Sequence, residues 1–150
     1  MGKLARMHRK GKDLYKGSGF SASTWGHQAC GLTKTNMELV ERHGAKSSGI
    51  RPAGRCRHTA NCIAFGPYGQ PKARIIGETF GTFFQLRAQM LLDKQEKDLR
   101  DGWLEARKRH DAEGSASIRG PMGVVIDWLK HLGWKPLGLG LFGCFLVLGE

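Results

Sequence analysis

Acidic side chains are the first group of residues in this sequence that could take part in catalysis. The dense acidic stretch contains Asp93, Glu96, Asp98 and Asp101. Two-metal nucleases and polymerases need carboxylates that hold two cations about 4 Å apart. Here the acids alternate with Lys94, Lys97 and Arg100, a pattern typical of opposite charges paired along a solvated helix. The stretch therefore favours an exposed charged helix over a catalytic metal centre.

Thiols and imidazoles form a second group, in the middle of the chain. Zinc is held by such side chains, and the weak candidates are Cys56, His58 and Cys62, with His43 or Cys30 as a further ligand. Their spacing matches no zinc finger, ribbon or knuckle, so we expect no metal site. Cys56 and His58 also make a poor nucleophile–base dyad, because residues two apart rarely face each other.

The third chemical motif is a partial phosphate loop. The run of residues 44–47 reads Gly-Ala-Lys-Ser, but Leu39 stands where the loop needs its first glycine. The run also follows an expected helix instead of a strand. Without a carboxylate pair, a nucleophile triad or a phosphate loop, the sequence predicts a protein that is not an enzyme and needs no cofactor.

Basic side chains remain, and they point to a polyanionic partner. The net charge is +11, and residues 1–60 carry 12 Lys/Arg against 3 Asp/Glu. A one-sided basic excess favours nucleic acid or an acidic membrane surface, although a tail that only aids solubility is the simpler alternative. The candidate nucleic-acid-binding residues are Lys3, Arg6, Arg9, Lys10, Lys12, Arg51, Arg55, Arg57, Lys72 and Tyr68.

The central loop combines these cations with aromatic rings. Arg51, Arg55, Arg57 and Lys72 flank Phe65 and Tyr68 in a glycine-rich stretch. Such a loop can approach phosphates closely, and a ring can stack on a base. We therefore expect weak, non-specific binding of RNA or DNA without catalysis. The alternative is that Phe65 belongs to the core and that the arginines are only solvated.

The elements that must position these residues are mainly helical. We expect a loop or short strand at 14–32, with an apolar cluster around Phe20 and Trp25. A helix should span 33–43, capped by Thr35 with Glu38 and ended by Gly44. A long loop should follow at 44–72, with a short strand or a helical turn at 60–65 as options.

The second half of the chain carries the stronger helical pattern. Apolar residues recur at three- and four-residue steps over 72–110, which predicts one kinked helix or two helices that break near 93–97 and end at 113–115. A third helix should span 121–131, with Trp128 buried as its main anchor against the helix at 75–91. Gly133 should end that helix.

These elements suggest a mainly α fold of about three helices with a basic, irregular first third. We expect a disordered basic arm at 1–13, one helical domain at 14–136 and an apolar, glycine-rich tail at 137–150. The tail is too short for a bilayer span of about 20 residues. Two alternatives to nucleic-acid binding stay open: a basic accessory subunit of a large assembly, and peripheral membrane attachment through residues 137–148.

Four cysteines without a CxxC pair suggest reduced thiols in an intracellular protein of the nucleus or cytoplasm. Residues 1–37 are rich in Lys and Arg, and Asp13 is the only acid among them. Import into an organelle is therefore a further option.

Several short motifs resemble a known family. They are Trp25-Gly26 followed by Gly31-Leu32-Thr33, Cys56-Arg57 through Phe65-Gly66, and the segments 118–123 and 132–134. In this order they resemble the region after the palm in reverse transcriptases of non-long-terminal-repeat retrotransposons. The likeness covers roughly residues 14–136.

The resemblance implies a thumb or connection fragment, which in that family tracks the template and primer and does no chemistry. The differences between this sequence and the family fit a thumb or connection fragment. The chain has no adjacent Asp-Asp pair of the kind that a palm needs, and no ribonuclease H carboxylate set follows. A free-standing copy would be a retroelement remnant, or a remnant recruited for another role. The apolar end from Leu137 onward has no counterpart in the family.

Overall fold

The chain forms two compact units in the computed structural model, which describes residues 10–50, 54, 56–136, 138–139 and 142–144. Unit 1 comprises Met1–His27 and Leu32–Gly77, and unit 2 comprises Gln28–Gly31 and Glu78–Glu150. The fold is mainly helical, as the sequence predicts. The residues expected to form one domain at 14–136 are thus divided between the two units.

Unit 1 begins with helices where the sequence predicts a loop or strand. They are α2 (Gly11–Leu14), the π-helix η1 (Tyr15–Gly19) and α3 (Phe20–Thr24), while α4 (His27–Cys30) spans the boundary between the units. The prediction for this region was wrong because tertiary burial of Tyr15 and Phe20 stabilises a helix that its glycines disfavour. Residues 10–13, assigned to a disordered arm, form a turn and most of α2, and residues 1–9 lie outside the described residues.

The next helices of unit 1 are α5 (Lys34–Ser47) and α6 (Arg57–Phe65). Thr33, not Thr35, caps α5, since the Thr33 side chain accepts a hydrogen bond from the Asn36 N–H at 3.2 Å. Gly44 does not end α5 but lies buried inside it. Helix α6 occupies much of the region expected to be a loop, and the predicted turn at 60–65 is its second half.

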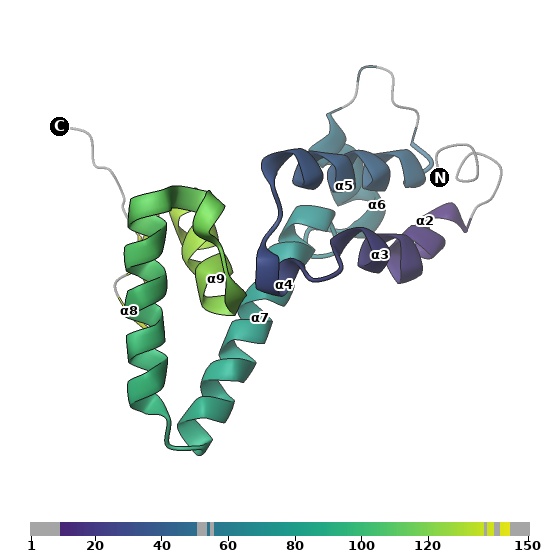
Figure 1. Cartoon of the computed structure of the whole chain (residues 1–150). Coiled ribbons are helices and arrows are strands. Elements are labelled where there is room, and N and C mark those ends of the chain that lie inside the picture. The colour runs from purple at the N-terminus through teal and green to yellow at the C-terminus, as the bar shows by residue number, and fades with distance from the viewer. Residues whose placement is uncertain (1–9, 51–53, 55, 137, 140–141, 145–150) are drawn as a thin grey trace. The chain divides into compact units, whose positions relative to one another are not determined.

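Buried aromatic and aliphatic side chains form the core of unit 1. Tyr15 is 2% exposed and donates its hydroxyl to the Val40 carbonyl at 2.8 Å, which ties η1 to α5. Its ring lies 5.6 Å from that of Phe65 on α6. Burial raises the pKa of Tyr15, so the phenol stays protonated and remains a donor. Figure 1 shows α2 and α3 running beside α5.

Unit 2 is built on a helical hairpin. Helix α7 (Pro71–Leu92) starts in unit 1 and continues into unit 2, and α8 (Glu96–Glu113) returns beside its far end. The break predicted near 93–97 is confirmed as two helices: Lys94 has a φ of 60°, and the Gln95 N–H donates to the Met90 carbonyl at 2.8 Å. Gly114, with a φ of 65°, follows α8 as predicted.

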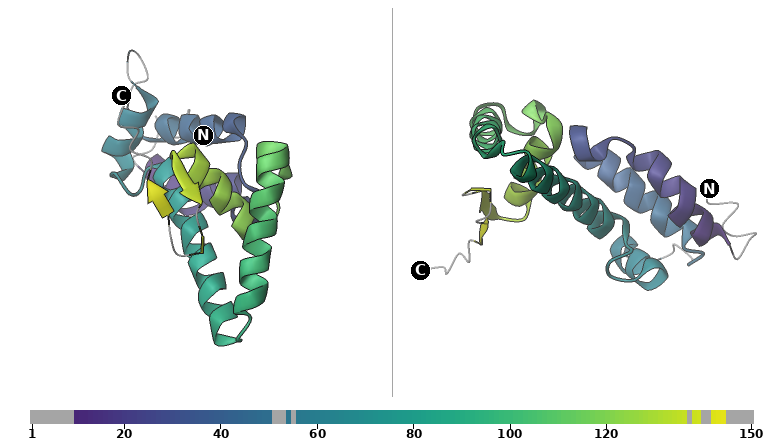
Figure 2. Two further views of the ribbon diagram at one scale, coloured as in Figure 1. Left: turned by 90° about the vertical axis from the view of Figure 1, so that its left-hand side faces the viewer. Right: turned by 90° about the horizontal axis from the view of Figure 1, so that it is seen from below.

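A 3-10 turn, η2 (Gly114–Ser117), leads to α9 (Gly120–His131), close to the helix predicted at 121–131. Helix α9 packs beside α8, as the two views of Figure 2 show. A two-stranded antiparallel sheet follows, in which β1 (Trp134–Pro136) pairs with β2 (Phe142–Cys144) and Lys135 lies opposite Gly143. The sequence did not predict this hairpin.

The core of unit 2 is one cluster of fully buried side chains: Phe83, Trp103, Val125, Ile126 and Leu129. Leu139 packs against it, so part of the predicted apolar tail belongs to this unit. The predicted anchor Trp128 is only half-buried and lies 6.0 Å from the His131 ring, whereas Trp103 is 2% exposed. Within the described ranges, no helix is both long and apolar enough to cross a membrane.

Candidate nucleic-acid interface

The charge of the protein is divided sharply between the two units. Unit 1 holds 14 Lys/Arg and 3 Asp/Glu, whereas unit 2 holds 10 of each. The entire net charge of +11 therefore belongs to unit 1. This partition is sharper than the one visible at residue 60, because the unit boundary at Gly77 adds Lys72 and Arg74 to the basic side.

Five of the ten predicted binding residues can be placed, and all five are exposed. Lys10 precedes α2 and Lys12 lies within it. Arg57 is the first residue of α6, and Lys72 is the second residue of α7. The other five, Lys3, Arg6, Arg9, Arg51 and Arg55, lie outside the described residues.

Tyr68 is held on a tight turn that joins α6 to α7, and 90% of it is exposed. Gly66 ends α6 with a φ of 77°, a conformation that glycine adopts at low cost. A Cβ on Gly69 would come within 2.1 Å of the Phe65 carbonyl oxygen, so this position also requires glycine. The Gln70 N–H closes the turn by donating to the Gly66 carbonyl at 3.1 Å. The turn thus presents the phenol ring to solvent.

Trp25 is a second exposed ring, and the sequence placed it wrongly in an apolar cluster with Phe20. Trp25 is 93% exposed, while Phe20 is 2% exposed. The chain turns at Gly26, whose φ is 76°, directly after α3 and Trp25. The two rings could not be separated from the sequence, because the helix that buries Phe20 and ends before Trp25 depends on tertiary packing.

Arg74 shows how one cation of unit 1 serves the fold instead of the surface. Its guanidinium lies 4.2 Å from the centre of the Phe20 ring, within cation–π range. It also donates a hydrogen bond to the Lys16 carbonyl at 3.0 Å. This residue is therefore committed to internal contacts, in contrast to the exposed Arg57 and Lys72.

The weak metal candidates are only partly brought together. The Cys62 Sγ atom lies 3.6 Å from the Nε2 atom of His58, one helical turn away on α6. Cys56 caps the start of α6, where the backbone amide of Thr59 and then that of His58 lower the pKa of the exposed thiol. No group of three or more His, Cys, Asp or Glu side chains in the described part of the chain is placed to hold a metal ion.

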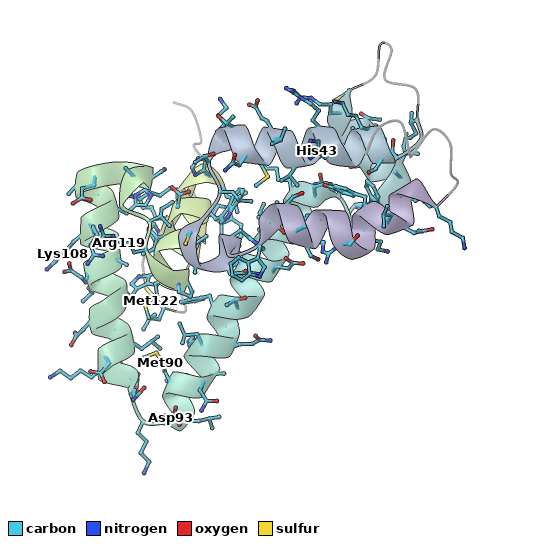
Figure 3. All side chains as sticks on the ribbon, turned by 45° about the vertical axis from the view of Figure 1, so that its right-hand side comes forward. His43, Met90, Asp93, Lys108, Arg119 and Met122 are labelled. Atoms are coloured by element: carbon cyan, nitrogen blue, oxygen red, sulfur yellow. The ribbon has the colours of Figure 1, made fainter. Side chains whose placement is uncertain are left out.

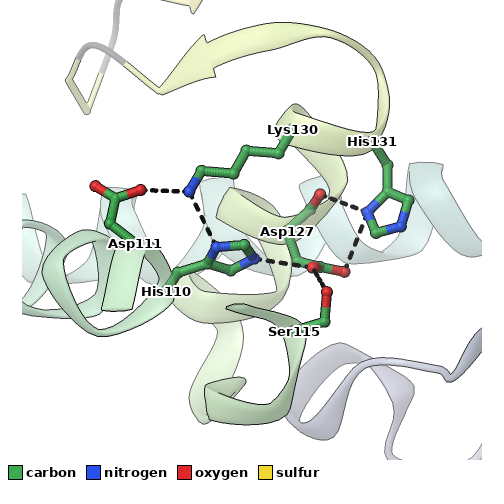
Figure 4. Close-up of polar contacts among 6 residues, drawn as sticks. All are labelled: His110, Asp111, Ser115, Asp127, Lys130 and His131. Atoms are coloured by element: carbon green, nitrogen blue, oxygen red, sulfur yellow. Dashed lines mark hydrogen bonds and ion pairs between the residues drawn. The ribbon is translucent and has the colours of Figure 1, made fainter. Parts of the chain in front are cut away.

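Unit 2 contains a polar network that the sequence did not predict (Figure 4). Asp127 on α9 is 9% exposed, and its Oδ1 atom lies 2.9 Å from His110 Nε2 and accepts from the Ser115 hydroxyl at 2.6 Å. Lys130 Nζ lies 3.0 Å from His110 Nδ1 and also pairs with Asp111. Its members come from α8, η2 and α9, and their spacing of 12 to 20 residues leaves no local signal.

Donor and acceptor chemistry limits the hydrogen bonds that this network can make. Lys130 has donors only, so a hydrogen bond from its Nζ atom to His110 Nδ1 requires the tautomer with the ring proton on Nε2, which faces Asp127. Ser115 donates to the carboxylate and not to the imidazole, so the histidine does not activate the hydroxyl as in a Ser–His–Asp triad. The hydrogen bond from Lys130 lowers the pKa of Asp111. The arrangement ties three elements together.

The acidic stretch of α8 behaves as the sequence predicts. Arg100 pairs with Glu96, and Arg109 pairs with Glu105 at 3.2 Å, each one turn apart on the exposed helix. Figure 3 shows the side chains along this hairpin, including Met90, Asp93 and Lys108. The exposed face of α8 carries local ion pairs, and unit 2 as a whole has equal numbers of basic and acidic side chains, so it has no net charge to offer a polyanion.

No protein-family model, curated protein or solved structure matches this chain.

Proposed function

We propose that unit 1 is a non-catalytic module that binds single-stranded RNA or DNA without sequence specificity. The observation that supports this most is the confinement of the whole +11 net charge to one unit. Phosphate contacts by Lys and Arg supply the sequence-independent part of nucleic-acid affinity. A unit with 14 basic and 3 acidic side chains has the charge for such contacts, whereas unit 2 has none in excess.

Two exposed rings give the module a means to prefer single strands. Tyr68 and Trp25 are 90% and 93% exposed, and each follows a helix whose end is set by glycine. Stacking of a base on an aromatic ring is worth about 1–3 kcal/mol and tolerates every base. Lys72 lies four residues after Tyr68, so that a phosphate contact is available near the stacked base.

The resemblance to the thumb and connection region of retrotransposon reverse transcriptases is consistent with this proposal. In that family the region tracks template and primer without chemistry, and we propose that this chain is a remnant that keeps the same role. The nucleus and the cytoplasm, or an organelle with its own nucleic acid, are the compartments where such a module would act.

A salt titration of the full chain tests the proposal. Affinity for a fluorescent single-stranded oligonucleotide is measured over a range of salt concentrations. If about 5 phosphates are neutralised, the log–log slope is about −3.5 for a single strand. A slope near zero would refute the electrostatic mechanism.

Charge variants of the two units supply the matched control. The triple variant Lys10→Gln, Lys12→Gln, Lys72→Gln should flatten the slope by about 2 and weaken binding. The control, Lys94→Gln, Lys97→Gln, Lys108→Gln, removes the same charge from unit 2 and should leave the slope unchanged. Equal effects of the two triple variants would show that net charge matters and that unit 1 is not the interface.

A further inference from the structure

The outer face of α6 carries a cysteine and a histidine that meet side by side. His58 is exposed, Cys62 is half-buried, and they are one turn apart, with Sγ and Nε2 separated by 3.6 Å. Cys62 is a free thiol. Both donor atoms belong to the softer ligand types that zinc-class metals prefer. The nucleic-acid proposal makes no use of this pair.

The separation of the two donor atoms is the one that a shared metal ion requires. Zinc bonds sulfur at about 2.3 Å and imidazole nitrogen at about 2.0–2.1 Å, in tetrahedral geometry. Those lengths and the tetrahedral angle place the sulfur and nitrogen about 3.6 Å apart. The observed distance of 3.6 Å therefore matches the separation of two ligands of one ion.

The helix that carries the pair is fixed on its opposite side. Ala60 and Asn61 are the buried residues of α6, and the Asn61 side-chain amide donates to the Glu41 carbonyl of α5 at 3.1 Å. At the end of α6 the Gly66 N–H donates to the Cys62 carbonyl at 2.9 Å. The backbone under both ligands is thus held in place, which lowers the entropy lost when an ion binds.

We propose that His58 and Cys62 chelate one zinc-class divalent ion per chain, with solvent in the remaining coordination positions. In the metal-free protein the two side chains make a weak contact between the thiol and the ring nitrogen. On binding, the thiol proton leaves to solvent, the sulfur–metal and nitrogen–metal bonds form, and no atom changes oxidation state.

The site is open and its affinity is modest for two reasons. The described residues provide no third protein ligand, whereas structural zinc sites use four. The basic surroundings also oppose a cation, although the thiolate offsets one of the two charges that the ion brings. The ion therefore has positions available for water or another ligand, unlike a closed structural zinc site.

Cobalt is the probe for this site because a bond from thiolate to Co²⁺ produces a charge-transfer absorption. The full chain is titrated with Co²⁺ under a reductant that contains no thiol. We expect the absorption to saturate at one ion per chain and to vanish on addition of Zn²⁺. Saturation at one ion per two chains would overturn the proposal, because the ion would then be shared between copies.

Substitutions then assign the ligands. Cys62→Ser should remove the absorption, and His58→Ala should weaken cobalt binding at least tenfold, since loss of even an outer-shell partner costs about that much. Cys30→Ser, Cys56→Ser and Cys144→Ser are the controls and should keep the absorption. The proposal fails if Cys62→Ser retains the signal or if a control loses it.

A melting experiment distinguishes a lost ligand from a lost fold. Zn²⁺ should raise the melting temperature of the natural chain and of Cys56→Ser, and should leave that of the His58→Ala, Cys62→Ser double variant unchanged. The double variant should keep its helical circular dichroism, since neither side chain is fully buried. An equal zinc shift in the double variant would place the metal elsewhere.

Discussion

Individual side chains of unit 2 differ widely in how much they contribute to its core, as two tryptophans show. Trp103 is 2% exposed and packs 5.5 Å from the Phe83 ring, while Trp128 is only half-buried. The sequence predicts that both tryptophans lie on apolar faces of their helices. The difference arises because α9 directs Val125 and Leu129 into the core and leaves Trp128 at its edge beside His131.

Trp103→Ala should destabilise unit 2 by about 3–5 kcal/mol, the usual cost of emptying a large core position. Trp103→Phe should cost less, because a ring still fills the site and the indole N–H, which is buried and has no hydrogen-bond partner among the described residues, is removed. Urea unfolding followed by circular dichroism measures both. The matched variant Trp128→Ala should cost less than Trp103→Ala, and the reverse order would contradict this assignment of the core.

The ion pair between Asp111 and Lys130 gives unit 2 a small dependence on pH. The hydrogen bond from Lys130 lowers the pKa of Asp111 below its ordinary value of 3.8. In the unfolded chain Asp111 has its ordinary pKa of 3.8, and in the folded chain its pKa is lower. The stabilisation from the ion pair is therefore complete above pH 3.8, and it is lost as the pH falls through the pKa of the folded state. Because the pair is largely exposed, its contribution is at most about 1 kcal/mol.

Asp111→Asn should therefore be less stable than the natural chain at pH 7 by no more than about 1 kcal/mol. The difference should shrink as the pH is taken below 3.8, because the natural carboxyl is then also neutral. Urea midpoints at several pH values provide the measurement. A stability difference that does not change with pH would show that the charge of Asp111 is irrelevant.

At the scale of elements, the crossing of α5 with its neighbours in unit 1 depends on a glycine. A Cβ added to Gly44 would lie 2.8 Å from Asn61 Oδ1 and 2.9 Å from Pro71 Cγ. These distances are too short for real contacts, so the three elements approach closely only because Gly44 has no side chain. From the sequence, Gly44 is predicted to end the helix, since its packing role depends on residues 17 and 27 positions further on.

Gly44→Ala should destabilise unit 1, although alanine favours a helix over glycine by about 1 kcal/mol. The control is Gly77→Ala on α7, where an added Cβ meets no atom of the described residues within 4 Å. That substitution should stabilise the protein by up to about 1 kcal/mol. Thermal melts of both variants test the pair of predictions. Stabilisation by Gly44→Ala would show that α5 can move away from Asn61 and Pro71 at no cost.

At the scale of the whole molecule, the net charge and the exposed aromatic rings Trp25 and Tyr68 are distributed unevenly between the two units. Unit 1 holds the net charge and the two exposed rings, while unit 2 balances its charges through pairs such as Arg109 with Glu105. A polyanion should therefore act on one unit only.

Hydrogen exchange of the full chain with and without a single-stranded oligonucleotide tests this expectation. Binding stabilises the state that binds, so amides of α5 and α6 should exchange more slowly in the complex. Amides of α8 and α9 should exchange at the same rate with and without the oligonucleotide. Slower exchange in α8 and α9 alone would contradict the assignment of the interface to unit 1.

The sequence predicts the mainly helical fold, the extent of α9 and the basic excess of the first half. For residues 72–110 it allows either one kinked helix or two helices, and the structure has two. These features depend on local signals: apolar spacing, glycine stops and charge count. The helices at 10–30 could not be predicted, because Tyr15 and Phe20 form them only by packing against distant residues. The same holds for Gly44 and for the choice of Trp103 over Trp128 as the anchor.

Which distant side chains contact each other could be seen only in the folded chain. The His110, Asp127 and Lys130 network joins residues up to 20 positions apart, so no periodicity in the sequence reveals it. The pairing of His58 with Cys62 needed the knowledge that residues 57–65 form a helix, since only a helix places residues four apart side by side. Likewise, the boundary at Gly77, which assigns the whole net charge to one unit, is a property of contacts and not of composition.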